Sequence, residues 1–438
     1  TLDMSDGGAA IFNHALFIPN NIVHVGDADT KFGFSDADTF HVLVGNVDTL
    51  VATANNLAIT GTVTGATSYN GIPFFSDATN NSMYTHDVSG TDDTAQYNTA
   101  YGFAALDAIT TGDQNVAIGY NALTANTTGF GNTVMGAFAG DALAGGARNV
   151  AIGNLALSTE DGHGHNVAVG YSALSVQNAG ADAYNVAVGS QAGVAVTTGI
   201  QNTLIGGNTG DSLTTGSYNV AIGYLALQAE DDHGRNIAIG YSALKTQNAG
   251  ADAYNVAVGY GAGSEITTGI QNTLLGGLAG DALTEGSNNV AIGYRALTSE
   301  TLHGRNVAIG QDALFAQNAG ANAFNVAIGF ETGKSVTTGV RNTIMGGLAG
   351  DALTTGGYNI AIGYSALGTE DTGAKSVAIG YAALGLQNYN GDAYNIAIGY
   401  STGSEITTGT FNTIIGGLAG DALTTGSGSV ALGYNALG

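Results

Sequence analysis

The first residues that could do chemistry are two histidines on either side of one glycine, His163 and His165. Imidazole nitrogens are common ligands of transition metals, so this pair could contribute to a metal site. The equivalent positions 70 residues later hold His233 and Arg235. An arginine would repel a cation, so the pattern favours a solvated loop over a metal site at these histidines.

Acidic residues are a second set of possible ligands. Aspartates recur every 70 residues in the motif G-D-A-L or G-D-S-L, at Asp141, Asp211, Asp281, Asp351 and Asp421. Acids this far apart cannot share one calcium ion, so an Asx turn is the better account of them. We expect the acidic runs Glu160-Asp161, Glu230-Asp231-Asp232 and Glu370-Asp371 to be solvated loops. Isolated structural calcium sites between chains remain the alternative.

Enzyme motifs are missing from the sequence. It contains no G-x-S-x-G, no H-E-x-x-H and no phosphate-binding loop. Most acids are repeated along the chain, whereas a catalytic site would be singular. We therefore expect a protein that is not an enzyme and has no cofactor.

One motif, N-V-A-I-G-Y-x-A-L, runs from Asn98 to the end of the chain and must position these residues. Its glycine recurs twenty times at spacings of 17 or 19 residues. From Gly153 onward the spacings 17, 19, 17 and 17 repeat with a period of 70. A repeat this short cannot be a pair of helices, so it predicts an all-β, parallel β-solenoid of stacked coils.

The apolar residues of each coil suggest which side chains face the core. Val116 and Ile118 lie two apart, so they point to the same side of a strand, and we predict that they face inward. Ala117 would then face outward or towards a neighbour. Ala122 and Leu123 form a second apolar row, which another chain would have to cover. Three chains packed around an axis would do so, which predicts a trimer.

Stacking places like residues above one another and predicts three ladders. Asparagines would bond to each other and cap the turns, at Asn115, Asn132, Asn149, Asn166 and Asn185. Glycines would allow a sharp bend, at Gly119, Gly136, Gly153, Gly170 and Gly189. Tyrosines would stack, or alternatively face a glycan, at Tyr120, Tyr171 and Tyr241.

The first part of the chain lacks the motif. Residues 1–68 are expected to form a β-rich N-terminal stem, residues 69–97 a connector, and residues 98–438 the repeat domain. Within the stem, the alternation of apolar residues predicts strands at Ala10 to Ile18, Ile22 to Val25, Lys31 to Phe34 and Thr39 to Val44.

The repeated motif resembles the S-V-A-I-G-x-x-A head repeats of trimeric autotransporter adhesins. Its longer form with T-T-G turns looks like repeats in bacteriophage tail fibres, and H-V-G-D-A-D-T-K-F-G-F-S-D-A-D-T-F resembles an N-terminal segment of such fibres. The resemblance implies a left-handed β-roll, a homotrimer and, for an H-x-H pair, an axial metal ion held by three chains. The sequence departs from the pattern where glycine replaces tyrosine, at Gly207, Gly277, Gly347 and Gly417.

The charge narrows the choice of partners. Nine basic residues face 34 acidic ones, for a net charge of −25, which repels nucleic acid and anionic membranes. No apolar run is long enough to insert into a membrane. We expect a structural and adhesive fibre in a virion, bound to tail or baseplate proteins and to a host cell-surface glycan or protein. The alternative is a bacterial surface adhesin or an extracellular filament subunit.

Overall fold

The structure, a computed structural model, describes the backbone of residues 21–24, 27–36, 39–44, 47–53, 56–58 and 75–77. It describes residues 80–85 and 94–438 together with their side chains. The strand predicted from Ala10 to Ile18 lies outside these residues. The chain divides into two compact units, Thr1–Pro73 and Phe74–Gly438.

The first unit holds one antiparallel sheet, in which each strand pairs with the next along the chain. Its strands are β1 (Asn21–His24), β2 (Asp27–Asp36), β3 (Thr39–Val44), β4 (Val47–Thr53) and β5 (Asn56–Ala58). The strands predicted at Ile22 to Val25, Lys31 to Phe34 and Thr39 to Val44 correspond to β1, β2 and β3. The prediction of a β-rich segment here is confirmed.

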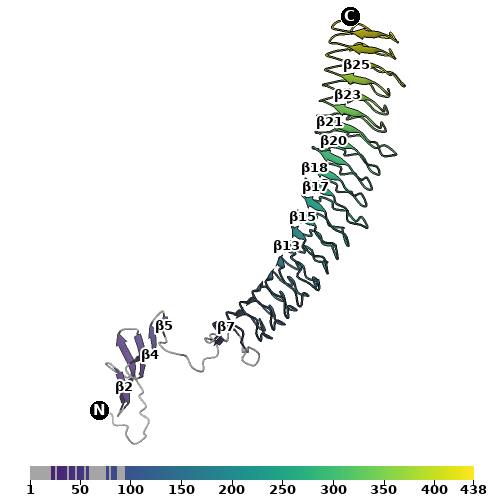
Figure 1. The fold of residues 1–438 in the computed structure, drawn as a ribbon. Helices are drawn as coiled ribbons and strands as arrows, with labels where there is room; N and C mark the ends of the chain where they lie inside the picture. The colour runs from purple at the N-terminus through teal and green to yellow at the C-terminus, as the bar shows by residue number, and fades with distance from the viewer. Residues whose placement is uncertain are drawn as a thin grey trace, which may run out of the picture. The chain divides into compact units, whose positions relative to one another are not determined.

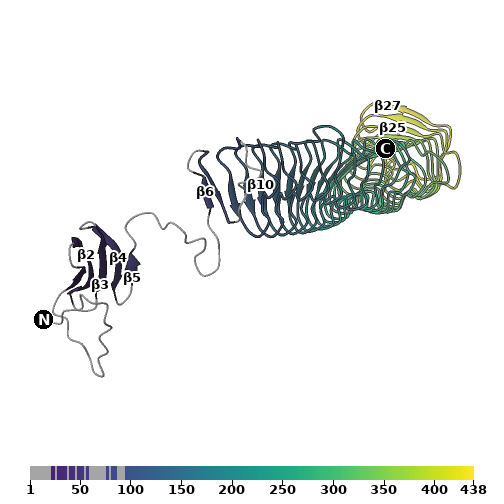
Figure 2. The same ribbon diagram turned by 90° about the horizontal axis from the view of Figure 1, so that it is seen from below.

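The second unit is a single ladder of short strands, stacked coil upon coil (Figures 1 and 2). It opens with β6 (Phe75–Asp77), which runs antiparallel to β7 (Ser82–Tyr84). From β7 onward every pairing is parallel. The three-residue strands that follow are β8 (Thr99–Tyr101), β9 (Val116–Ile118), β10 (Thr133–Met135), β11 (Val150–Ile152), β12 (Val167–Val169), β13 (Val186–Val188), β14 (Thr203–Ile205), β15 (Val220–Ile222), β16 (Ile237–Ile239), β17 (Val256–Val258), β18 (Thr273–Leu275), β19 (Val290–Ile292), β20 (Val307–Ile309), β21 (Val326–Ile328), β22 (Thr343–Met345), β23 (Ile360–Ile362), β24 (Val377–Ile379), β25 (Ile396–Ile398), β26 (Thr413–Ile415) and β27 (Val430–Leu432).

The register of this ladder confirms the predicted parallel solenoid with coils of 17 and 19 residues. Val150 pairs with Val167 across a 17-residue coil, and Val167 pairs with Val186 across a 19-residue coil. The extra residues therefore lie in a loop and leave the stack unchanged. Because β7 pairs with β8, the ladder begins upstream of Asn98, within the segment expected to be a connector. The described residues contain no helix, and hence none that could cross a membrane.

The predicted orientation of the strand side chains is wrong. Ala117 is fully buried, whereas Val116 and Ile118 are only partly buried, and the same pattern holds in the other coils. The reason is the width of the coil. The row of Ala122 and Leu123 closes the opposite side of the same coil, so little space remains for more than an alanine from the strand.

The second apolar row is also placed differently from the prediction. Ala122 and Leu123 are fully buried within their own chain and belong to one core that runs the length of the ladder. No other chain is needed to cover them. The apolar surface that remains uncovered is the outward side of the strands.

The backbone of the x-A-L segment has an unusual conformation. Asn121 and Leu123 have φ angles of 53° and 56°, in the left-handed region that costs a non-glycine residue about 1–2 kcal/mol. Hydrogen bonds to neighbouring coils accompany this strain: Asn121 N–H donates to Phe103 and Leu123 N–H donates to Ala139, both at 3.0 Å. Stacking thus supports a backbone that one coil alone would not hold.

Candidate functional site

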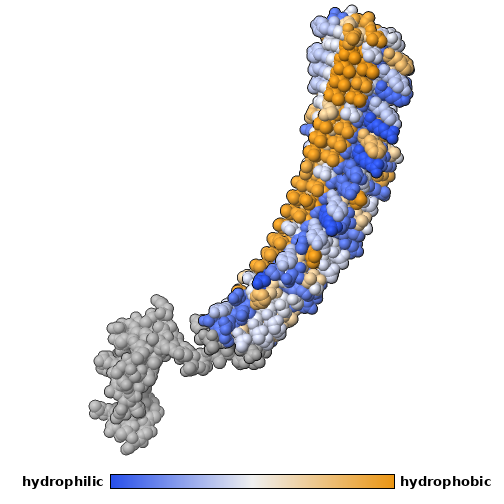
Figure 3. Space-filling model, in the orientation of Figure 1, coloured by the Kyte–Doolittle hydropathy of each residue, from blue (hydrophilic) through white to orange (hydrophobic). Residues whose placement is uncertain are grey.

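The outward side of the ladder is a long aliphatic stripe. Figure 3 shows it as a hydrophobic band along the edge where Figure 1 labels strands from β13 to β23. Valine and isoleucine form most of it because they occupy the first and third positions of the strands. Five isoleucines are each 36–38% exposed: Ile205, Ile237, Ile360, Ile396 and Ile398. A continuous apolar surface of this kind is typical of a site of protein association.

The buried asparagines form the predicted ladder, although most of its bonds are to backbone rather than between side chains. Asn132 N–H donates to the Asn115 Oδ1 atom at 3.0 Å, and the Asn115 side-chain amide donates to the Gly129 carbonyl at 2.8 Å. The column continues through Asn149, Asn166 and Asn185 in the same way. These residues have a structural role, because each side-chain oxygen accepts the N–H of the asparagine in the next coil. The amide nitrogen of Asn166 has no partner, whereas the other four amides also donate.

The glycine column is required by contact between coils. A Cβ atom on Gly119 would lie 2.6 Å from the carbonyl oxygen of Gly136, and one on Gly170 would lie 2.2 Å from that of Gly189. Gly136 and Gly153 approach the next coil equally closely. Any side chain would therefore separate the coils at this bend.

Tyrosines that follow this glycine stack in short runs on the surface. Tyr241 lies between Tyr224 and Tyr260, with ring centroids 5.8 and 5.2 Å apart, and Tyr120 stacks on Phe103 at 6.0 Å. Tyr171 is exposed beside residues that are not aromatic. The run around Tyr241 is short because Gly207 and Gly277 replace tyrosine in the coils on either side of it.

A second column, which combines aromatic rings and cations, was missed by the sequence analysis. Arg235 lies over the rings of Tyr218 and Tyr254, at 5.6 and 5.5 Å from their centroids. Lys375 lies 5.1 Å from the Tyr394 ring. The signal was available, since each of these residues directly precedes the asparagine of its coil or, for Lys375, the serine that replaces it. The column concentrates scarce positive charge on one line of a very acidic chain.

The two histidines of the H-x-H pair have different neighbours. His163 places its Nδ1 atom 3.4 Å from the Glu160 carboxylate, inside its own loop. His165 belongs to the aromatic column: its ring stacks on Tyr184 at 4.7 Å, and its Nε2 atom lies 3.7 Å from Asp182. Within one chain the pair therefore does not converge on a shared ligand.

The expectation that the glutamates of the acidic runs are solvated is wrong. Glu160, Glu230 and Glu370 are fully buried, as is the equivalent Glu300. Each glutamate turns inward, and one oxygen accepts the backbone N–H three residues later, for example His163 N–H at 3.2 Å. Burial raises the pKa of all four carboxyl groups, that of Glu230 to about 7.

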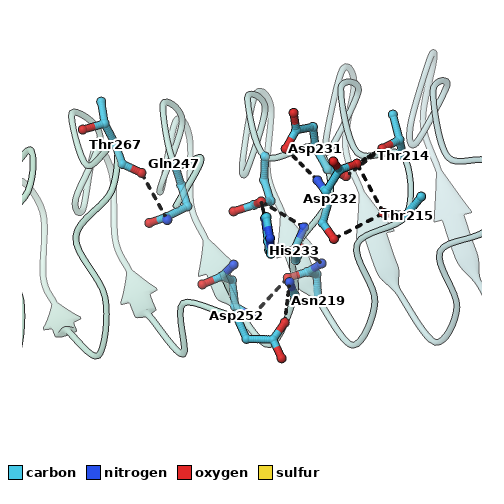
Figure 4. Close-up of polar contacts among 12 residues, drawn as sticks. Thr214, Thr215, Asn219, Asp231, Asp232, His233, Gln247, Asp252 and Thr267 are labelled. Carbon is cyan, nitrogen blue, oxygen red and sulfur yellow. Dashed lines mark hydrogen bonds and ion pairs between the residues drawn. The ribbon is translucent and has the colours of Figure 1, made fainter. Parts of the chain in front are cut away.

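Two of these glutamates lie in clusters with the chemistry of metal ligands. We call Glu160, Asp161 and His163 the first cluster, and Glu230, Asp231 and His233 the second cluster. In each cluster one ligand atom from every residue lies within 4.8 Å of the other two. Figure 4 shows Asp231 and His233 of the second cluster beside the preceding coil, whose Thr214 donates to Asp232 at 2.6 Å. That bond lowers the pKa of Asp232, so the exposed side of the loop stays acidic.

The aspartates of the G-D-A-L motif serve contacts between coils. Asp281 accepts a hydrogen bond from the Thr298 hydroxyl at 2.6 Å, and Asp211 accepts one from the Gln228 amide at 3.2 Å. Burial raises the pKa of Asp141 and Asp351. Among the described residues, neither of the possible metal clusters includes them.

The comparisons with known proteins add no relative to this description. The chain matches no model of a known protein family, and no curated protein matches it.

Proposed function

We propose that the chain is a structural fibre subunit, most specifically the shaft of a bacteriophage tail fibre that presents or contributes to host-receptor binding. One observation carries the proposal: twenty near-identical coils stack in unbroken register from β8 to β27. By strand spacing alone, such a stack spans about 95 Å. A rod of this kind suits a mechanical task rather than catalysis.

The assembled form in this proposal is a homotrimer. The support is the aliphatic stripe, which would expose a long apolar surface to water if the chain stayed alone. Two further copies packed around an axis would bury the three stripes against each other. The net charge of −25 per chain would then lie on the outside and keep the fibre soluble.

The proposed partners follow from this geometry. One end of the fibre would join tail or baseplate proteins of the virion, and the host cell-surface glycan or protein would be met by exposed residues. Exposed tyrosines such as Tyr171 and Tyr241 supply flat rings on which sugars stack. We propose neither a nucleic acid nor a membrane as a partner, because the chain is strongly acidic.

Sedimentation equilibrium and negative-stain electron microscopy of the full chain test the assembly. We expect a mass of three times 43.6 kDa and rods of uniform length. A stable monomer at micromolar concentration would contradict the trimer.

Immunogold labelling tests the location. Antibodies against the repeat domain should label the tails of virions in a lysate from the source. Label on bacterial envelopes or on free filaments would instead support the alternative, a surface adhesin or extracellular filament subunit.

A further inference from the structure

The first and second clusters each combine one imidazole with two carboxylates. Atoms that share a cation at about 2.1 Å lie at most about 4.2 Å apart. The ligand atoms here lie within 4.8 Å of one another, so a small side-chain rotation would bring them to coordination distance. The aspartate and the histidine of each cluster are exposed or half-buried, which leaves the cluster open to solvent on its outer side.

A second observation points to a missing ligand. The Oε2 atom of Glu160 and the Nδ1 atom of His163 are both shielded from water, and neither has a hydrogen-bond partner. The corresponding atoms of Glu230 and His233 are in the same condition. The glutamate side chains are fully buried. Buried polar atoms are almost always satisfied in folded proteins, so a buried carboxylate oxygen without a partner, beside an imidazole nitrogen without a hydrogen bond, points to a missing cation.

We propose that the first and second clusters each bind one divalent transition-metal cation of the zinc class. The glutamate Oε2, the aspartate carboxylate and the histidine Nδ1 would be the protein ligands, and water would complete the shell. Imidazole with two carboxylates is a donor set that zinc accepts, whereas calcium and magnesium prefer oxygen alone.

Charge supports the same assignment. Burial raises the pKa of Glu160 and Glu230, and the nearby aspartate raises each further by repulsion. A bound divalent cation would relieve both effects, because it neutralises two carboxylates at once. The bound ion would also tie the loop to the edge of its coil.

The two later repeats supply matched comparisons within the chain. In the third repeat, Thr301 replaces the aspartate between Glu300 and His303. In the fourth, Gly373 replaces the histidine, and Gln387 donates to the Glu370 Oε2 atom at 2.8 Å. Where the histidine is lost, a neutral amide satisfies the glutamate. The third repeat keeps the unpaired Glu300 Oε2 and His303 Nδ1 atoms and lacks only the aspartate of the donor set.

Zinc uptake by the full chain tests the proposal. Chain stripped with a chelator is titrated with zinc chloride by calorimetry, with equilibrium dialysis as a second readout. We expect two ions per chain, one for His163→Ala and none for the double variant with His233→Ala. The control His303→Ala should keep two ions, because its cluster lacks the aspartate. Thermal melting without zinc should be unchanged in the double variant, and zinc should raise the melting temperature of the wild type but not that of the double variant.

A gain-of-site variant makes the test independent of any loss of folding. Thr301→Asp completes the third cluster and should raise the uptake to three ions per chain. Unchanged uptake in the double histidine variant, or in Thr301→Asp, would overturn the proposal. Equal binding of calcium chloride at these sites would overturn the assignment to the zinc class.

Discussion

Each asparagine of the buried column links its own coil to the two beside it. Asn202 N–H donates to Asn185, its Oδ1 atom accepts the Asn219 N–H at 2.9 Å, and its side-chain amide donates to Gly216 at 2.9 Å. The side chain therefore satisfies one donor and one acceptor that water cannot reach. Alanine at this position would leave both unpaired.

We expect Asn202→Ala to lower the free energy of unfolding by at least about 2 kcal/mol, since each orphaned buried group costs about 1–3 kcal/mol. Urea titration followed by circular dichroism measures the change. Asn248→Ala is the matched control, because Asn248 is exposed in the loop of a 19-residue coil. Similar losses in both variants would show that the buried column contributes no special stability.

Glu370 predicts a dependence of stability on pH. Its carboxyl group is buried, which raises its pKa above the ordinary value despite hydrogen bonds from Gly373 and Gln387. The folded state therefore binds its proton more tightly than the unfolded state does. As pH rises above the unfolded pKa of about 4.3, the carboxyl group ionises more readily in the unfolded state than in the folded state, so the free energy of unfolding falls.

Glu370→Gln removes the titrating group. We therefore expect its melting temperature to fall less than that of the wild type between about pH 4 and 8, the range in which the carboxyl group loses its proton. Melting curves across this range, with a chelator present, provide the measurement. Glu405→Gln changes an exposed acid and should keep the wild-type slope. Parallel curves for wild type and Glu370→Gln would contradict the prediction.

At the scale of the coil, the 70-residue period reflects a packing rule. The inward residue of most strands is alanine, but in β14 it is Leu204, which is fully buried. Space for it comes from two glycines: a Cβ on Gly193 would lie 2.6 Å from Leu204, and one on Gly210 would lie 3.1 Å from it. Val196 and Leu213 then fill the rest of their coils. Large and small residues thus exchange places while the filled volume is kept.

We expect Leu204→Ala to cost about 2–5 kcal/mol of unfolding free energy, because the flanking glycines cannot fill the cavity that it leaves. Urea titration measures the loss. Leu302→Ala is the matched control, since Leu302 lies on the surface and is 52% exposed. A loss from Leu204→Ala no larger than that of the control would show that this layer is loosely packed.

The sequence predicted the spacing, register and asparagine column of these coils, because each depends on repetition alone. It could not predict which side of a three-residue strand faces inward. Period-two alternation assigns Val116 and Ile118 to one side and Ala117 to the other, and only the width of the coil decides between them. An alanine core would be unusual in a broad sheet but fits a narrow coil.

The burial of the glutamates was missed for a different reason. Glu160 stands beside Asp161 in a polar loop, and adjacent acids are usually solvated. A signal was nevertheless present, because glutamate recurs at residues 160, 230, 300 and 370 while its neighbour varies to Thr301. The positions of the unpaired Oε2 and Nδ1 atoms depend on side-chain rotamers, which no spacing in the sequence specifies.

At the scale of the whole molecule, the aliphatic stripe replaces the Ala-Leu row as the basis for a trimer. The first residues of β16, β23 and β25 are exposed although they are isoleucines. Association would remove them from water at about 25 cal/mol for each Å² of apolar surface buried, a driving force that adds up along twenty coils. Charge on this stripe should oppose association, because it would have to be desolvated in the interface.

The triple variant Ile237→Glu, Ile360→Glu and Ile396→Glu should therefore sediment as a single chain of 43.6 kDa under conditions in which we expect the wild type to form trimers. Each coil should stay folded, because these side chains point away from the core and Ala238, Ala361 and Ala397 still fill it. Unchanged far-ultraviolet circular dichroism checks this. The control Leu302→Glu adds charge to an exposed loop away from the strands and should leave the assembly intact. A triple variant that still sediments with the wild type would place the contact between chains on another face, with the aromatic and cation column as the next surface to substitute.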